Sequence, residues 1–267
     1  MSLLLKKYRD EFLAGRSFEP ADAEPLLDAL ITETDEEPIA GLLTAWNAKG
    51  VSSGEIFDFA RILRSRMKRV NAVHKTYVDI VGTGGSTAKT FNVSTAASFV
   101  VAGAGVPVAK HGNKAATSNS GSADVLSVLG IDPAVSPETA EACLNAVGIC
   151  FMFAPNFHRL SPTLAKVRRG LGFPTIFNCV GPLCNPASAP HQLIGVWDKE
   201  LVPMMAEALA RLGTKRSWIV HGEDGLDEIS LSGRTLVAEI DRGSIRSFEI
   251  AARDLGLGVD EPSGLRS

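Results

Sequence analysis

From Tyr77 onward, short apolar runs alternate with stretches of helical periodicity, and this alternation limits the possible folds more than any other feature. It is typical of βαβ units, which build a doubly wound, mostly parallel sheet with helices on both faces. The expected strands are 77–81, 106–109, 149–153, 193–196 and 218–220, and the expected helices are 94–104, 122–129, 137–147 and 200–212. Ligands of such sheets bind beyond the carboxyl ends of the strands. The loops after the strands are therefore where we expect chemistry.

The first 74 residues follow a different pattern, because their apolar residues recur at helical spacing throughout. The expected helices are 3–14, 23–31, 38–48 and 55–70, and the glycines Gly15 and Gly50 end two of them. The predicted fold is thus a small N-terminal helical bundle plus a larger α/β domain. We expect a helical domain over 1–74 and an α/β domain over 75–267, with the segment from about 158 to 190 packing against the helices.

Composition excludes several classes of protein. The net charge of −3 argues against a nucleic-acid binder, which usually has a basic excess. No apolar run reaches the roughly 18–20 residues of a membrane span, and the N-terminus lacks the charge order of a secretory signal. The four cysteines form no Cys-x-x-Cys pair and are expected to be reduced thiols. We expect a cytoplasmic protein that binds neither nucleic acid nor membrane.

A glycine-rich loop follows the first expected strand and reads GTGGSTAKT over 82–90. Its glycines let the backbone approach an anion closely. A dinucleotide fingerprint would need glycine in place of Thr87, and a P-loop would need glycine in place of Ala88. The next residues, 92–95, open a helix, whose N-terminus favours phosphate. A structural turn followed by an ordinary Ser94 or Thr95 cap is the alternative.

Polar residues follow other strands as well. The segment 110–114 reads KHGNK, and 118–124 places hydroxyls and a glycine at another helix start. The adjacent carboxylates Asp227 and Glu228 are oxygen ligands of the kind that Mg²⁺ prefers. Arg168, on an amphipathic helix, is suited to holding a carboxylate. Taken singly, each of these is also compatible with a solvated loop or helix end.

Together, these segments resemble the anthranilate phosphoribosyltransferases. The motifs GTGG, NVST, KHGN, SGSADVL, FAP–H, VRR–LG–TIFN–GPL–NP and GLDE occur in the family's order between about Asp79 and Ser230. The resemblance implies an enzyme, a pentosyltransferase of tryptophan biosynthesis. It would transfer the phosphoribosyl group from phosphoribosyl pyrophosphate to anthranilate, with Mg²⁺ as cofactor. A homodimer through the helical domain is also implied.

The resemblance also implies a role for particular residues. Phosphoribosyl pyrophosphate would be bound by Gly82, Gly85, Ser86, Thr90, Asn92, Val93, Ser94, Thr95, Lys110, Gly112, Asn113, Lys114, Ser118 and Ser122. Anthranilate would be bound by Gly82, Asn113, His158 and Arg168, and the metal by Ser94, Asp227 and Glu228. The catalytic residues would be Lys110 and His111. The reaction needs positioning and stabilisation of charge on the leaving pyrophosphate more than it needs a covalent nucleophile.

Three departures from the family pattern bear on these expectations. Ser86 stands where an aspartate often follows GTGG, and Pro174 replaces a frequent arginine. The family's members continue past the point that corresponds to Ser267, so we expect this chain to lack their C-terminal part. The alternatives are a non-catalytic relative that binds a phosphate ligand or nucleic acid, a pyrimidine nucleoside phosphorylase of similar architecture, and an inactive truncated form. Asp227-Glu228 and the Arg168 helix disfavour the phosphorylase.

Overall fold

The computed structural model describes residues 3–85, 91–114 and 121–258, and its centre is one sheet of seven strands in the order β3-β2-β1-β4-β5-β6-β7. The strands are β1 (Val78–Gly82), β2 (Val108–Gly112), β3 (Ile149–Phe153), β4 (His191–Gly195), β5 (Arg216–Gly222), β6 (Arg234–Asp241) and β7 (Ser244–Ala251). The four pairings among β1 to β5 are parallel, and β6 and β7 are antiparallel. The mostly parallel sheet predicted from the sequence is confirmed.

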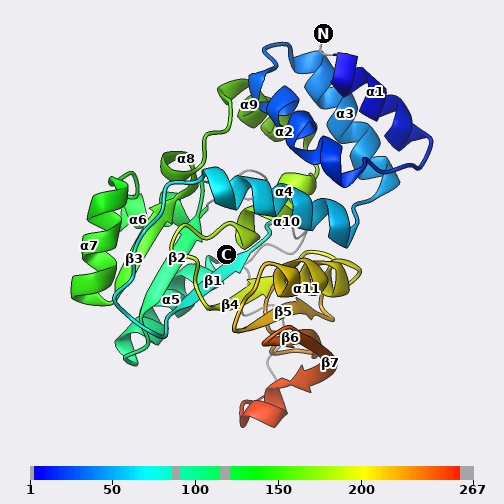
Figure 1. The fold of residues 1–267 in the computed structure, drawn as a ribbon. Helices are drawn as coiled ribbons and strands as arrows, with labels where there is room; N and C mark the ends of the chain where they lie inside the picture. The colour runs from blue at the N-terminus through cyan, green and yellow to red at the C-terminus, as the bar shows by residue number, and fades with distance from the viewer. Residues whose placement is uncertain (1–2, 86–90, 115–120, 259–267) are drawn as a thin grey trace.

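The N-terminal helices are α1 (Leu3–Leu13), α2 (Ala23–Thr32), α3 (Glu36–Lys49) and α4 (Ser53–Arg66), with a short 3-10 turn η1 (Pro20–Asp22). The later helices are α5 (Val93–Gly103), α6 (Ser122–Val128), α7 (Pro137–Val147), α8 (Ala154–Phe157), α9 (Pro162–Leu171), α10 (Ile176–Leu183), α11 (Leu201–Arg211) and a 3-10 turn η2 (Ala252–Leu255). Figure 1 shows α1 to α3 at one end of the molecule, with α9 beside them. No helix of the described ranges is both long and apolar enough to cross a bilayer.

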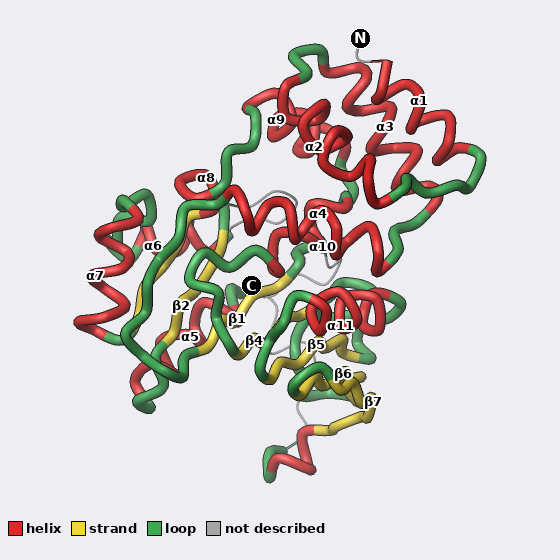
Figure 2. Tube along the Cα trace, viewed as in Figure 1, coloured by secondary structure: helices red, strands yellow, loops and turns green. Residues whose placement is uncertain are grey.

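The order of the strands places helices on both faces of the sheet. From β1 the chain runs through β2 to β3 in one direction, and β4 and β5 extend the sheet in the other. Right-handed crossovers in opposite directions put their helices on opposite faces. Accordingly, α5 packs on β1 and β2, whereas α11 packs on β5 and β6 (Figure 2).

The hairpin of β6 and β7 was not expected from the sequence. Its turn is formed by Arg242 and Gly243, both with positive φ, which is the geometry of tight two-residue hairpin loops. Strand β6 is buried at most of its length, whereas β7 is largely exposed. An alternating pattern on β7 and a glycine-containing turn were the available signals.

The segment after β3 returns to the N-terminal helices. Helix α9 packs against α3, and α10 packs against α4 and α3. A large apolar cluster, here called the main core, combines buried residues of α1 to α4, α9 to α11 and β4 to β6. A smaller cluster, here called the edge core, combines residues of β2, β3, α7 and α8 with Val70 and Ala187. Because the main core includes residues on both sides of residue 75, the division into domains 1–74 and 75–267 stays a prediction.

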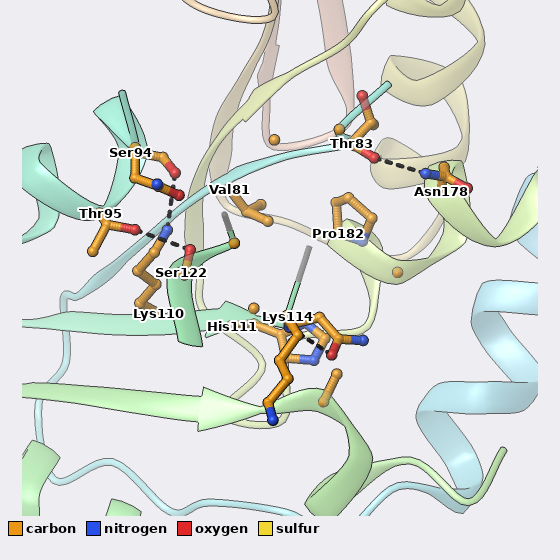
Figure 3. Close-up of a pocket in the computed structure, with 18 of the residues that line it drawn as sticks. Val81, Thr83, Ser94, Thr95, Lys110, His111, Lys114, Ser122, Asn178 and Pro182 are labelled. Carbon is orange, nitrogen blue, oxygen red and sulfur yellow. Dashed lines mark hydrogen bonds between the residues drawn. The ribbon is translucent and has the colours of Figure 1, made fainter. Parts of the chain in front are cut away.

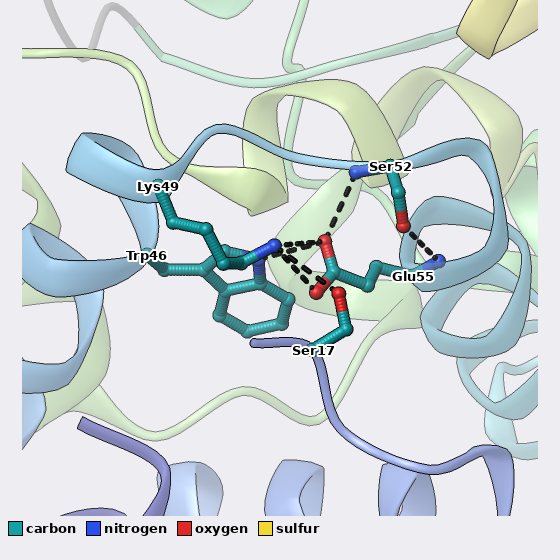
Figure 4. A network of polar contacts seen from close by, with 5 residues as sticks. All are labelled: Ser17, Trp46, Lys49, Ser52 and Glu55. Carbon is teal, nitrogen blue, oxygen red and sulfur yellow. Dashed lines mark hydrogen bonds and ion pairs between the residues drawn. The ribbon is translucent and has the colours of Figure 1, made fainter. Parts of the chain in front are cut away.

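A buried ion pair fixes the start of α4. Glu55 is 3% exposed, and its carboxylate accepts hydrogen bonds from Lys49 Nζ at 2.8 Å and Trp46 Nε1 at 3.1 Å. It also accepts from the backbone N–H of Ser52, while Ser52 Oγ accepts from the backbone N–H of Glu55, which completes a capping box (Figure 4). Lys49 contacts Ser17 as well. One carboxylate therefore joins α3 to α4.

Replacing Glu55 with glutamine should lower the free energy of unfolding by about 2 kcal/mol, because hydrogen bonds to charged groups contribute about that much. The change removes the charge beside Lys49 and leaves the size of the side chain unaltered. Urea denaturation measures the difference. The control is Glu24→Gln, which removes an exposed partner of Arg66 and should cost at most about 1 kcal/mol. Equal effects of the two substitutions would contradict a structural role for the buried pair.

Candidate functional site

A cavity of about 990 Å³ lies at the carboxyl ends of β1 and β2 (Figure 3). Every described residue of the predicted site lines it: Gly82, Gly85, Asn92, Val93, Ser94, Thr95, Lys110, His111, Gly112, Asn113, Lys114, Ser122, His158, Arg168, Asp227 and Glu228. Ser86, Thr90 and Ser118 lie outside the described residues. The structure thus brings together residues that are up to about 150 positions apart in the chain, as expected for loops at one edge of a parallel sheet.

The described part of the glycine loop is anchored from two sides. The backbone N–H of Thr83 donates to Gly195 O of β4 at 2.9 Å. The Thr83 carbonyl accepts from Asn178 Nδ2 of α10 at 3.1 Å. Gly85 has a φ of +90°, and a Cβ there would lie 2.6 Å from Pro174 Cγ. Only glycine fits this position without rearrangement, and Pro174 is one of the groups that crowd it.

The alternative interpretation of Ser94 or Thr95 as an ordinary helix cap is wrong, because neither hydroxyl caps α5. The N-cap is Asn92, which makes no side-chain cap hydrogen bond. Ser94 Oγ instead accepts from Lys110 Nζ at 3.2 Å, and Thr95 Oγ1 donates to Ser122 Oγ at 2.9 Å. These contacts join the starts of α5 and α6 to β2 on one side of the cavity.

Lys110 is a buried cation at the end of β2. It is 3% exposed, and its Nζ donates to Ile80 O at 2.6 Å in addition to Ser94. Burial lowers the pKa of Lys110 to about 8, and the nearby carboxylates of Asp79 and Glu228 oppose that shift. Lys110 thus lies where a buried anion would find a positive charge.

His111 and His158 form a buried pair on another side of the cavity. Their Nε2 atoms are 3.2 Å apart, and their ring planes are inclined by 60°. Burial lowers the pKa of His158 to about 4 and the pKa of His111 well below its usual range. Both imidazoles are therefore neutral near pH 7, and at most one of them can present a proton at the Nε2 contact.

Asp227 lies against the ends of β1 and β4, and the backbone of Glu228 lies beside Gly222 at the end of β5. A Cβ on Gly82 would come within 2.9 Å of Asp227 Oδ2, and a Cβ on Gly195 would overlap the Asp227 carbonyl. Burial raises the pKa of Asp227, and burial with the repulsion of Asp227 raises the pKa of Glu228 to about 8. The described ranges hold no group of three or more His, Cys, Asp or Glu side chains arranged around a metal. Asp227 and Glu228 are both partly buried, and as a carboxylate pair they fit Mg²⁺, which often uses one or two carboxylates plus substrate phosphates.

Arg168 projects from α9 toward the cavity. Its guanidinium carbon lies 5.1 Å from the centre of the Phe177 ring, and its Nε is buried with no hydrogen-bond partner among the described residues. Burial lowers the pKa of Arg168 to about 10. No carboxylate of the described chain forms an ion pair with it. A partly buried guanidinium with an unpartnered Nε and no ion pair within the described chain is suited to binding an anion.

Sequence reasoning missed three polar residues at or beside the cavity: Asn178, which lines it, and Asp79 and Asn185, which bond to the strands behind it. Asp79 and Asn185 are fully buried, and Asn178 holds the glycine loop. A charged residue inside the apolar run VDIV was a usable signal for Asp79, because a buried charge needs partners. No sequence signal indicated which residues those partners are.

Comparisons with known proteins cover most of the chain. The family model described as the glycosyl transferase family a/b domain matches residues 74–267. The anthranilate phosphoribosyltransferase of Moorella thermoacetica is 44% identical over 255 residues, which are 95% of this chain and 75% of that protein. The enzyme of the same name from Rubrobacter xylanophilus is 46% identical over 263 residues, or 98% of this chain and 77% of that protein.

Two solved structures are similar over almost the whole chain. Anthranilate phosphoribosyltransferase from Thermus thermophilus superposes with a TM-score of 0.86 at 38% identity, covering 97% of this chain and 78% of that one. The Saccharomyces cerevisiae enzyme in complex with phosphoribosyl pyrophosphate and Mg superposes with a TM-score of 0.87 at 31% identity, covering 100% of this chain and 78% of that one. This chain therefore spans about three quarters of the length of these relatives.

Proposed function

Because this chain belongs to the anthranilate phosphoribosyltransferase family, we propose that it transfers the phosphoribosyl group from phosphoribosyl pyrophosphate to anthranilate in tryptophan biosynthesis. The products are N-(5-phosphoribosyl)anthranilate and pyrophosphate. One observation carries the proposal. A single cavity combines a glycine loop, a buried cation, a carboxylate pair and Arg168, whose buried Nε has no hydrogen-bond partner and which has no ion pair within the described chain.

The phosphate-binding side of the cavity suits phosphoribosyl pyrophosphate. The described part of the glycine loop and the N-terminus of α5 both line the cavity, and a helix N-terminus favours anions. Lys110 is placed to stabilise the charge that grows on pyrophosphate as the glycosidic bond breaks. We assign the diphosphate and ribose phosphate to this side, with Asn113, Lys114 and Ser122 as further contacts.

Asp227, Glu228 and Ser94 would hold Mg²⁺. When bound, the metal ion supplies positive charge that screens the diphosphate, and it relieves the unfavourable burial of the two carboxylates. The remaining ligands would be oxygens of the substrate and of water.

Anthranilate would bind between Arg168 and the histidine pair. Arg168 would hold the carboxylate, and Asn113 and Gly82 would contact the ring and its amine. The anthranilate nitrogen forms its bond to the anomeric carbon as the bond from that carbon to the pyrophosphate oxygen breaks. The nitrogen then loses a proton, and the ring nitrogens of His111 and His158, which line the cavity, are its proposed acceptors. The chain's residues thus act by positioning and charge, not by a covalent intermediate.

The helical domain, residues 1–74, would carry a homodimer contact. Leu3 and Leu13 of α1 are 85% and 67% exposed, so apolar side chains are available on that surface. The α/β domain, residues 75–267, would carry the phosphoribosyl pyrophosphate site.

The test of the proposed function is pyrophosphate release by the purified chain. We expect release that requires anthranilate, phosphoribosyl pyrophosphate and Mg²⁺ together, with one N-(5-phosphoribosyl)anthranilate formed per pyrophosphate. Binding of phosphoribosyl pyrophosphate in a calorimeter without turnover would identify a binding protein instead. Turnover that proceeds equally well without anthranilate would mean that the acceptor is a different molecule.

A further inference from the structure

The ladder between β1 and β2 is interrupted at the cavity. Strand β1 pairs with β4 at five positions, and β2 pairs with β3 at five. Between β1 and β2, both of which are fully described, the register contains a single pair, Val78 with Val108. Beyond that pair, the backbone groups of the two strands that would normally bond to each other need other partners.

Two charged side chains supply those partners. The carbonyl of Ile80 on β1 accepts a hydrogen bond from Lys110 Nζ at 2.6 Å. The backbone N–H of His111 on β2 donates to Asp79 Oδ1 at 3.1 Å. A side chain of β2 thus bonds to the backbone of β1, and a side chain of β1 bonds to the backbone of β2. The strands stay neighbours, and Lys110 and His111 both line the cavity.

Asp79 is itself held in one orientation. It is fully buried, and its Oδ2 accepts from Asn185 Nδ2 at 2.8 Å. The same Asn185 amide donates to Ala109 O at 2.8 Å, and its Oδ1 accepts from the backbone N–H of Ala187 at 2.9 Å. Asn185 therefore ties the loop after α10 to both strands at the interruption. Asp79 lines no part of the cavity and is outside the residues assigned to the substrates.

We infer that Asp79 is a positioning residue of the transferase, one that acts through the backbone of His111 and the charge of Lys110 and does not touch the substrates. The inference rests on the proposed function. A carboxylate there offers two acceptor oxygens, one for His111 N–H and one for Asn185, and a negative charge beside Lys110. An amide of the same shape cannot supply all three, because one of its two ends is a donor.

Asp79→Asn is the direct test. It removes the negative charge, and the new amide NH₂ group must face either the NH₂ group of Asn185 or the backbone N–H of His111, so that two donors meet. The displacement of reacting groups by about 1 Å can cost about 100-fold in rate, so we expect kcat to fall by about that factor. Lys110 and His111 act mainly on the transition state, so KM for phosphoribosyl pyrophosphate should change by less than about threefold. The ¹⁵N-edited imidazole signals of His111 and His158 should also move.

Glu55→Gln is the matched control, since it makes the same carboxylate-to-amide change at a buried hydrogen-bonded site away from the cavity. It should lower stability while leaving kcat and both imidazole signals unchanged. If Asp79→Asn loses stability as Glu55→Gln does, with kcat or the imidazole signals unaltered, Asp79 is merely structural and the inference is wrong.

Two other outcomes need their own measurement: a wild-type chain without turnover, and an Asp79→Asn variant that does not fold. If the wild-type chain shows no turnover, the proposed function fails, and the imidazole signals alone decide whether Asp79 positions His111. If Asp79→Asn does not fold, Asn185→Ser loosens the same carboxylate more gently and should lower kcat about tenfold with the same spectral change. Unchanged imidazole signals in that variant would overturn the inference.

Discussion

Arg168→Ala should lower kcat/KM for anthranilate by about 30-fold to several thousand-fold and barely change the affinity for phosphoribosyl pyrophosphate. Truncating one member of a buried charged pair costs about 2–5 kcal/mol, which corresponds to that range. The guanidinium stacks on Phe177, its Nε is buried without a partner in the described chain, and burial lowers its pKa to about 10. An incoming carboxylate would relieve this unfavourable burial, which is why we expect a large effect confined to one substrate.

Steady-state kinetics with each substrate varied in turn measures this effect. The matched control is Arg169→Ala, because Arg169 is the next residue of α9 and is exposed. That variant should keep both kinetic constants within about twofold, as expected for a surface change. Equal losses for both substrates in Arg168→Ala would identify a structural arginine, and no loss for either would remove the carboxylate clamp from the mechanism.

Replacing both Asp227 and Glu228 with alanine should abolish most Mg²⁺-dependent turnover, a loss of about 100-fold or more. The fold should persist, because burial raises the pKa of both side chains and their ionised forms are unfavourable where they lie. The expected pattern is low activity at limiting Mg²⁺ together with an unfolding transition no weaker than that of the wild type. Titration of activity with Mg²⁺ and thermal unfolding without the metal measure the two parts.

The control for the carboxylate pair is Glu223→Gln, on the same loop. Glu223 is exposed and accepts from the backbone N–H of Arg234 at 3.1 Å, which a glutamine oxygen can also do. This variant should keep the Mg²⁺ dependence of the wild type. Unchanged activity of the double variant at limiting Mg²⁺ would remove Asp227 and Glu228 from the metal site.

The sequence predicted the sheet and the contents of the cavity because both depend on local patterns. Short apolar runs identified β1 to β5, and a parallel sheet brings the residues after its strands to one edge. Lys110 and Asp227 could therefore be placed near each other from their positions along the chain, whereas Arg168, on a helix, was assigned to the site by the family resemblance; the cavity contains all three. The family resemblance supplied their roles.

The parts that escaped prediction depend on contacts between distant segments. The bridge from Asp79 to Asn185 joins residues 106 positions apart, and it has meaning only once the β1–β2 ladder is known to be interrupted. The ring beneath Arg168 comes from a different helix, which no spacing on α9 could reveal. The hairpin of β6 and β7 was missed for a local reason, because its two-residue Arg242-Gly243 turn contains only one glycine and is a weak signal on its own.

The interrupted ladder coincides with the boundary between the two apolar clusters, and this has a consequence for cooperativity. Strands β2 and β3 belong to the edge core, and β4 to β6 belong to the main core. Across the boundary, one ladder pair and the side-chain bonds of Asp79, Lys110 and Asn185 replace a continuous sheet. Regions joined so sparsely open as separate units with different free energies. Amide hydrogens of β2, β3 and α7 should therefore exchange as one group ahead of those of β4 and β5, so that the half of the sheet that bears Lys110 and His111 is the first to loosen.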